Sequence, residues 1–197
     1  MVSKNKEAEQ VLICLYPTDT VYGLGVDATS VDAIRALREL KGGTTVMDKK
    51  YLVAVDGLDM VRGIAKVTPL AEKLAHQFWP GALSLVLEST LFPEELTCGT
   101  GTVAVRMPDH PAALALVKEF GRPITSTSAN LTGQPTLSSV QEILTQFGEK
   151  ARMITRVIDG GVLPESKPST LVDARGEAPV FLRIGAISEV AILEALR

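Results

Sequence analysis

Three small polar side chains stand at alternate positions in residues 124–130, which read ITSTSAN. Ser126, Ser128 and Asn130 would share one face if this segment stays extended, because strand side chains alternate between faces. Two hydroxyls and a carboxamide on one face suit a small polyanionic or zwitterionic ligand. The alternative is a Ser/Thr/Asn turn whose side chains cap their own backbone.

Arg106 interrupts the otherwise apolar run TVAVRM at 102–107. Alternation puts Thr102, Ala104 and Arg106 on the same face of a strand. A guanidinium among such small residues needs an anionic partner. Two partners remain open: the carboxylate of Asp109, or a ligand carboxylate held by the guanidinium fork.

A second polar cluster follows the first apolar run, in the sequence YPTDTVYGLG at 16–25. Open sheets commonly bind ligands just past strand ends, and the glycines would let the backbone approach a ligand closely. The alternative is a structural turn with capping hydroxyls. The glycine spacing is not that of a phosphate-binding P-loop. The polar side chains of this cluster are Thr18, Asp19, Thr20 and Tyr22.

A basic, glycine-containing stretch reads LKGGTTVMDKK at 40–50. Lys41 stands at the end of an expected helix, where a lysine usually satisfies terminal carbonyls. The functional interpretation is a loop in which Lys41, Lys49 and Lys50 grip phosphates, since lysine acts as a mobile point charge.

Polar residues also occur near two late apolar runs. Ser169 precedes the run TLVD, and Arg183 lies within VFLRI. Each could be a ligand contact or an ordinary polar residue of an edge strand. His76 and His110 are interpreted as structural, because no metal-ligand spacing joins them. The G-x-S-x-G motif of one serine-hydrolase class does not occur.

Composition indicates the kind of fold that must position these residues. The chain has 197 residues, of which 46% are hydrophobic and only 5% aromatic. This predicts one domain, spanning 1–197, with a core of Val, Leu, Ile and Ala, as in layered α/β proteins. A net charge of −3 argues against holding nucleic acid by bulk electrostatics, although a local basic patch remains open.

Cysteine usage and hydropathy favour a cytoplasmic protein. Cys14 and Cys98 have no metal-ligand spacing, and Cys14 lies in an apolar run that predicts burial. No apolar stretch reaches the roughly 18 residues that a membrane helix needs. The polar first residues do not resemble a signal peptide.

Strand-like and helix-like segments alternate along the chain. Apolar runs predict strands at 11–17, 51–55, 83–87, 102–107, 170–173 and 180–184. Caps and stop signals predict helices at 30–41, from Thr68 to Pro80–Gly81, at 110–120, at 139–147 and from Ser188 onward. This order predicts an α/β domain with a mixed, twisted sheet.

Taken together, the motifs resemble those of the YrdC-like family, the threonylcarbamoyl-AMP synthases. The resemblance runs from about Tyr16 to Ile187, keeps the family order, and is closest to short single-domain members. The motifs that carry it are PTDTVYGLG, LKGG, FWPGALSLVL, GTVAVRMPDHP, PITSTSANLTGQP, PSTLVD and LRIGAI.

The resemblance implies a twisted sheet around a large concave cavity. It also implies an enzyme that combines L-threonine, bicarbonate or CO2, and ATP into threonylcarbamoyl-AMP and pyrophosphate. That product feeds the t6A modification of tRNA, so the implied partners are the downstream t6A transferase machinery and tRNA or double-stranded RNA. Mg2+ is expected to accompany the ATP phosphates.

The resemblance also implies roles for particular residues. Lys41, Ser128 and Asn130 belong to the family's signature and are the expected catalytic residues. L-threonine is expected to contact Thr20, Arg106, Ser126 and Ser169. ATP is expected to contact Thr102, Ser128, Thr136 and Arg183. The basic stretch, and not the resemblance, adds Lys49 and Lys50 as expected phosphate contacts.

The basic stretch departs from the family pattern of Lys-Gly-Arg-Pro. Gly43 occupies the arginine position and Thr44 the proline position. Lys49 or Lys50 could replace the missing guanidinium. The alternative is a non-catalytic paralogue that keeps the cavity and binds a nucleotide, double-stranded RNA or tRNA.

Overall fold

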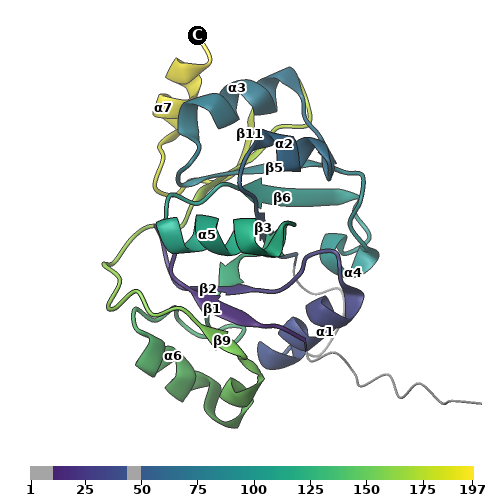
Figure 1. The fold of residues 1–197 in the computed structure, drawn as a ribbon. Coiled ribbons are helices and arrows are strands. Elements are labelled where there is room, and N and C mark those ends of the chain that lie inside the picture. The colour runs from purple at the N-terminus through teal and green to yellow at the C-terminus, as the bar shows by residue number, and fades with distance from the viewer. Residues whose placement is uncertain (1–10, 44–49) are drawn as a thin grey trace, which may run out of the picture.

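The computed structural model describes residues 11–43 and 50–197, and their strands form two sheets with helices around them (Figure 1). The larger sheet lies against α3 and α7, and the smaller sheet lies toward α6 at the other end of the molecule (Figure 1). The predicted α/β class is confirmed, with the mixed pairing spread over both sheets.

The smaller sheet has four strands in the order β8-β2-β1-β9. Strands β1 and β2 form an antiparallel pair, and β9 pairs in parallel with β1. The strands are β1 (Cys14–Tyr16), β2 (Gly23–Gly25), β8 (Thr127–Ser128) and β9 (Arg156–Val157).

The larger sheet has seven strands, in the order β11-β10-β5-β6-β3-β7, with β4 paired to β5. Two of its pairs, β10 with β5 and β3 with β6, are parallel, and the others are antiparallel. The strands are β3 (Leu52–Ala54), β4 (Ala65–Lys66), β5 (Leu83–Ser89), β6 (Thr102–Arg106), β7 (Ile124–Thr125), β10 (Thr170–Asp173) and β11 (Val180–Arg183).

The predicted helices are confirmed, and their caps explain where they begin. The hydroxyls of Ser30, Thr68, Ser139 and Ser188 each accept a backbone N–H from the first turn that follows. The helices are α1 (Val31–Leu40), α2 (Leu58–Arg62), α3 (Pro69–Phe78), α4 (Glu94–Thr97), α5 (Pro111–Phe120), α6 (Val140–Phe147) and α7 (Glu189–Ala195), with a 3-10 turn η1 (Gly148–Met153) after α6. Within the described residues, none of these helices is long and apolar enough to cross a membrane.

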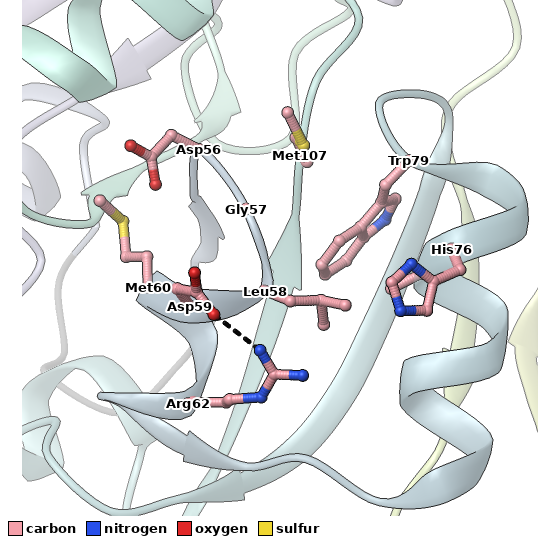
Figure 2. Close-up of a pocket in the computed structure, with 10 residues that line it drawn as sticks. Asp56, Gly57, Leu58, Asp59, Met60, Arg62, His76, Trp79 and Met107 are labelled. Carbon is pink, nitrogen blue, oxygen red and sulfur yellow. Dashed lines mark hydrogen bonds and ion pairs between the residues drawn. The ribbon is translucent and has the colours of Figure 1, made fainter.

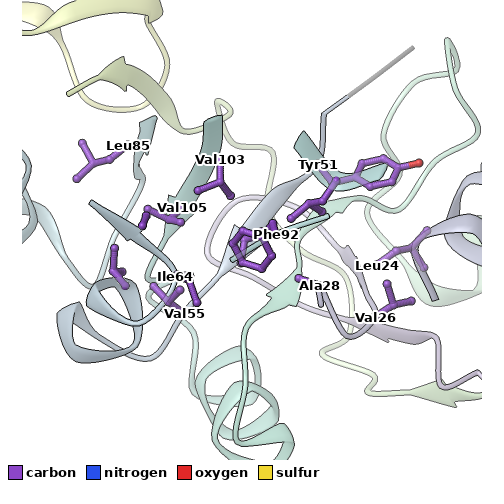
Figure 3. Packing of buried hydrophobic residues seen from close by; sticks show 14 of the residues in the cluster. Leu24, Val26, Ala28, Tyr51, Val55, Ile64, Leu85, Phe92, Val103 and Val105 are labelled. Carbon is purple, nitrogen blue, oxygen red and sulfur yellow. The ribbon is translucent and has the colours of Figure 1, made fainter. Parts of the chain in front are cut away.

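The core is aliphatic, as the composition predicts. It runs from Val105 and Leu85 in the larger sheet, past Phe92, to Leu24 and Val26 beside the smaller one (Figure 3). Cys14 is completely buried, which confirms its prediction as a small core residue. Burial raises the pKa of its thiol to about 11.

The chain passes from the larger sheet to the smaller one at Ser126. Strand β7 ends at Thr125, β8 begins at Thr127, and the Ser126 N–H donates to the Leu52 carbonyl of β3 at 2.6 Å. Next to this junction, a side chain on Gly25 would lie 2.8 Å from the Tyr16 ring. It would also lie 3.2 Å from Ile124 and from the Thr125 carbonyl of β7, so the absence of a Cβ lets the two sheets approach just before residues 126–130.

Candidate functional site

A cavity of about 360 Å³ lies at the junction of the two sheets. It gathers polar side chains from the loop after β1, the end of β6, the junction segment, and the chain that leads into β10. Its polar lining residues are Thr18, Thr20, Lys50, Arg106, Ser126, Thr127, Ser128, Thr136, Ser166, Ser169 and Arg183. Nine residues singled out from the sequence, all of these except Thr127 and Ser166, are thus brought together.

Arg106 supplies the most deeply placed charge of this cavity. Its side chain is only 5% exposed. Its Nε donates to the Gly81 carbonyl at 2.8 Å, and Nη1 donates to Thr20 Oγ1 at 3.0 Å. Burial lowers the pKa of the guanidinium, and the neighbouring Asp19 carboxylate opposes that shift.

The anionic partner of Arg106 within the protein is Asp19, so the Asp109 alternative is wrong. Arg106 Nη2 donates to Asp19 Oδ2 at 2.5 Å. Asp109 takes part only through its backbone, whose N–H donates to Asp19 Oδ1 at 3.2 Å. The carboxylate therefore comes from the polar cluster after β1.

The hydroxyl of Thr20 has one hydrogen, which it can donate to Thr18 or into the cavity. Thr18 Oγ1 donates its only hydrogen to the Val21 carbonyl at 2.7 Å and accepts two backbone N–H groups. Thr20 Oγ1 lies 3.1 Å from Thr18 Oγ1 and accepts from Arg106. Its own hydrogen can therefore go to Thr18 or to an oxygen of a ligand.

The segment 126–130 combines both alternatives that its sequence left open. Ser126 and Ser128 line the cavity, as expected of a ligand-binding face. Asn130 does not share this face: its Nδ2 donates to the carbonyls of Leu131 at 3.0 Å and Gln134 at 2.5 Å. The prediction of one common face is wrong at Asn130 because the chain turns after Ser128.

Lys41 lies beneath this turn, only 2% exposed, and not in the cavity wall. Its Nζ donates to the carbonyls of Ser128 at 2.6 Å and Asn130 at 2.7 Å. Asn130 Oδ1, 3.4 Å from the same nitrogen, also accepts the Ser128 hydroxyl at 2.6 Å. Lys41 thus fixes the backbone that carries Ser128, and its catalytic role stays a prediction.

A bulge on the edge strand β11 directs Arg183 toward the cavity. Phe181 stands opposite buried Val172, and a shift in register then puts Arg183, instead of Leu182, opposite Leu171. The guanidinium donates from Nε to the Ser169 carbonyl at 3.0 Å and from Nη2 to Ser169 Oγ at 3.1 Å. Arg183 and Ser169 therefore reach the cavity together.

A second cavity, of about 400 Å³, adjoins the first across Lys50, Leu52 and Arg183. Thr102 lines this second cavity and not the first. Its Oγ1 accepts a hydrogen bond from Lys50 Nζ at 2.9 Å. Its floor is largely apolar, and its edge carries basic groups. The floor residues include Val86, Ala104, Leu171 and Leu182.

Thr136, an expected ATP contact, is one of the residues that line the first cavity. Lys49, another expected ATP contact, lies outside the described residues.

Sequence reasoning missed Ser166, whose hydroxyl donates to the Thr20 carbonyl at 2.5 Å. No periodicity or motif marks Ser166, which stands in a loop just before the PST motif.

A pocket of about 530 Å³ lies elsewhere and contains none of the expected site residues (Figure 2). Its cation Arg62 is already paired with Asp59 and Glu72. The Trp79 indole N–H donates to the Leu83 carbonyl at 2.8 Å. His76 is exposed at its edge, while His110 caps α5 by accepting the Ala112 N–H, as a structural role requires. We therefore regard the cavity around Arg106 as the candidate site.

Residues 11–43 and 50–197 contain no group of three or more His, Cys, Asp or Glu side chains that could hold a metal ion. The acidic groups nearest the two cavities are Asp19, paired with Arg106, and Asp173, paired with Arg175. Neither offers an unpaired carboxylate to a cation.

Comparison with protein families gives one match over most of the chain. A family model named Sua5_yciO_yrdC, described as "Telomere recombination", matches residues 8–185. Threonylcarbamoyl-AMP synthase of Bacillus subtilis is 36% identical over 183 residues, which are 91% of this chain and 51% of that protein. The Vibrio vulnificus (strain YJ016) protein of the same name is 34% identical, over 87% of this chain and 92% of its own length.

Solved structures have the same fold. Pyrococcus abyssi Sua5 complexed with L-threonine has a TM-score of 0.86 and 36% identity, covering 94% of this chain and 54% of that one. Escherichia coli YciO has a TM-score of 0.79 and 26% identity, covering 92% and 86%. The chain spans about half the length of the first curated relatives that it matches.

Proposed function

The chain belongs to the Sua5/YciO/YrdC family, and from that premise we propose that it is a threonylcarbamoyl-AMP synthase. The reaction joins L-threonine, bicarbonate or CO2, and ATP, and it releases pyrophosphate. We take residues 1–197 as one catalytic domain for this reaction.

The observation that carries the proposal is the arrangement around Arg106. An α-amino acid presents a carboxylate, and Arg106 offers a buried fork beside the hydroxyl of Thr20. Ser126 and Ser169 line the same cavity. These four residues match the set expected for L-threonine, and a relative with this fold was solved with L-threonine bound.

ATP would extend from this cavity into the adjoining one. Ser128 and Thr136 lie on the first cavity, while Thr102 lies on the second. Lys50 and Arg183 lie on both and would face the phosphates. The apolar floor of the second cavity suits a base. Lys49, in the segment before Lys50, is proposed as a further phosphate contact.

The proposed chemistry needs positioning and charge neutralisation more than a protein nucleophile. The threonine amine adds to CO2 and loses a proton, which gives a carbamate. A carbamate oxygen then attacks the α-phosphorus, and pyrophosphate leaves. Both reactants are anionic, so Arg106, Arg183 and Lys50 would lower their repulsion, and the hydroxyls would orient them.

Mg2+ would arrive with ATP in this proposal. It commonly keeps several waters and binds phosphates plus one or two carboxylates. Because Asp19 and Asp173 are paired with arginines, phosphate oxygens and water would supply most of the ligands of Mg2+. Bound Mg2+ would neutralise charge on the phosphates.

The product would pass to the downstream t6A transferase machinery, and tRNA is the proposed final acceptor. A cytoplasmic location, predicted from the sequence, suits that role. A second candidate, a non-catalytic protein that binds a nucleotide or double-stranded RNA, is favoured by Gly43 in place of the family's arginine. RNA binding would weaken steeply with added salt, whereas binding of L-threonine would not.

Calorimetric titration separates these candidates. L-Threonine and ATP are titrated singly and then together. The synthase proposal expects heat from L-threonine and tighter binding of each ligand when the other is present. The absence of any L-threonine binding would contradict it, and RNA binding alone would favour the second candidate.

A further inference from the structure

Arg106 is held by three acceptors that come from two different parts of the fold. They are the Gly81 carbonyl before β5, the Thr20 hydroxyl after β1, and the Asp19 carboxylate. A guanidinium has five N–H donors. The remaining two, one on each terminal nitrogen, have no acceptor among the described residues and are available to a ligand.

Asp19 is fixed on its other side as well. Its Oδ1 accepts the backbone N–H of Asp109, which follows β6, while its Oδ2 accepts from Arg106. The side chain is 19% exposed and does not belong to the cavity lining. Its bond to Arg106 gives Asp19 a route by which it can influence a bound ligand.

We propose that Asp19 is a positioning residue, which holds the Arg106 guanidinium so that its two free N–H groups face the carboxylate of the bound amino acid. This inference rests on the proposed function. Without Asp19, only the bonds to Gly81 and Thr20 would hold the planar guanidinium, which could then tilt as a unit about these two bonds. A fork that must be ordered on binding gives lower affinity than one ordered beforehand.

Two substitutions distinguish the effect of the position of the Asp19 side chain from the effect of its charge. Asp19→Ala removes the bond to Arg106 and the bond to the Asp109 N–H. Asp19→Asn keeps the size of the side chain, and its amide oxygen can still accept from Arg106. Its NH2 group would then face the Asp109 N–H, so the side chain is held from one side only. The order of L-threonine affinity should therefore be wild type, then Asp19→Asn, then Asp19→Ala.

Asp27 provides a matched control. It is 20% exposed, pairs with Arg122 at 2.8 Å, and does not line either cavity. Asp27→Ala removes a carboxylate of similar exposure from an ion pair of similar length. It should leave L-threonine binding within about twofold of wild type, because Asp27 lines neither cavity and surface substitutions usually have small effects.

The test is calorimetric titration of L-threonine into each protein without ATP. We expect affinity to fall about 10- to 100-fold in Asp19→Ala, since the charge-assisted bond that orients Arg106 is lost. In turnover assays, KM for L-threonine should rise by the same factor, with kcat at saturation and KM for ATP unchanged.

Three results would overturn the inference. Wild-type affinity in both Asp19 variants would show that Asp19 has no role. A parallel rise in the KM values for ATP and L-threonine, with a lower thermal midpoint, would show a general structural role. If the wild-type protein binds no L-threonine, the proposed function fails and the inference fails with it, whereas equal binding by all variants refutes the inference alone.

Discussion

Arg106 and Thr20 are 86 residues apart in the chain, and their side chains meet at 3.0 Å. One lies at the end of β6 and the other in the loop after β1, so this contact joins the larger sheet to the smaller one. It puts a buried cation beside a hydroxyl donor in the candidate site.

Arg106→Lys should abolish most L-threonine binding while the charge is kept. Lysine cannot present two parallel N–H groups to a carboxylate. Loss of two charge-assisted bonds predicts a fall in affinity of about 100-fold or more. Titration calorimetry measures this, with Arg122→Lys in the exposed pair with Asp27 as the control. Equal affinities for both variants would remove Arg106 from the ligand site.

Ser126→Ala and Asn130→Ala should separate ligand binding from the structure of the turn. Ser126 lines the cavity, so its loss should weaken L-threonine binding by about tenfold and change stability by less than about 1 kcal/mol. Asn130→Ala removes two donors to backbone carbonyls and should lower the free energy of unfolding by about 1–3 kcal/mol. Urea unfolding and calorimetry measure both effects; a reversed pattern would contradict this division of roles.

Lys41→Met should destabilise the protein, because the carbonyls of Ser128 and Asn130 would lose the ammonium that binds them. Unsatisfied buried acceptors predict a loss of about 1–3 kcal/mol in the free energy of unfolding. Lys118→Met, an exposed lysine in the last turn of α5, should change it by less than about 0.5 kcal/mol. If the two variants unfold alike in urea, Lys41 does not stabilise this segment.

Stability should fall in alkaline solution because several buried acids, Cys14, Tyr16 and Tyr51 among them, resist ionisation. Burial raises the pKa of Cys14 to about 11 and that of Tyr51 to about 12, from ordinary values of 9.0 and 10.0. The unfolded chain ionises first, so the free energy of unfolding is undiminished below about pH 9 and falls as pH rises toward the folded values. Urea unfolding across this range should show a smaller fall in Cys14→Ala; an identical fall would contradict the assignment.

Local signals predicted the helices well. Ser30, Thr68 and Ser188 cap helices that begin where the sequence places them, because a cap depends only on residues of the next turn. The very short strands β7 and β8 were not predicted separately. Their division at Ser126 depends on hydrogen bonds to Leu52 and to β2, which are distant in sequence.

The sequence predicted which residues form the candidate site better than it predicted the contacts between them. Motif resemblance identified Arg106, Thr20 and Ser169, and the structure brings all three to one cavity. The pairing of Arg106 with Asp19 spans 87 residues, so the nearer Asp109 was the natural but wrong partner. Alternation also failed to predict the turn at Asn130, since a turn ends the extended geometry on which alternation depends.

The most direct test of the account is pyrophosphate release from ATP by the purified protein. We predict release that requires both L-threonine and bicarbonate, is lost when either is omitted, and is accompanied by threonylcarbamoyl-AMP. Absence of release with all three substrates present, or release at the same rate without L-threonine, would contradict the proposal that this cavity makes threonylcarbamoyl-AMP.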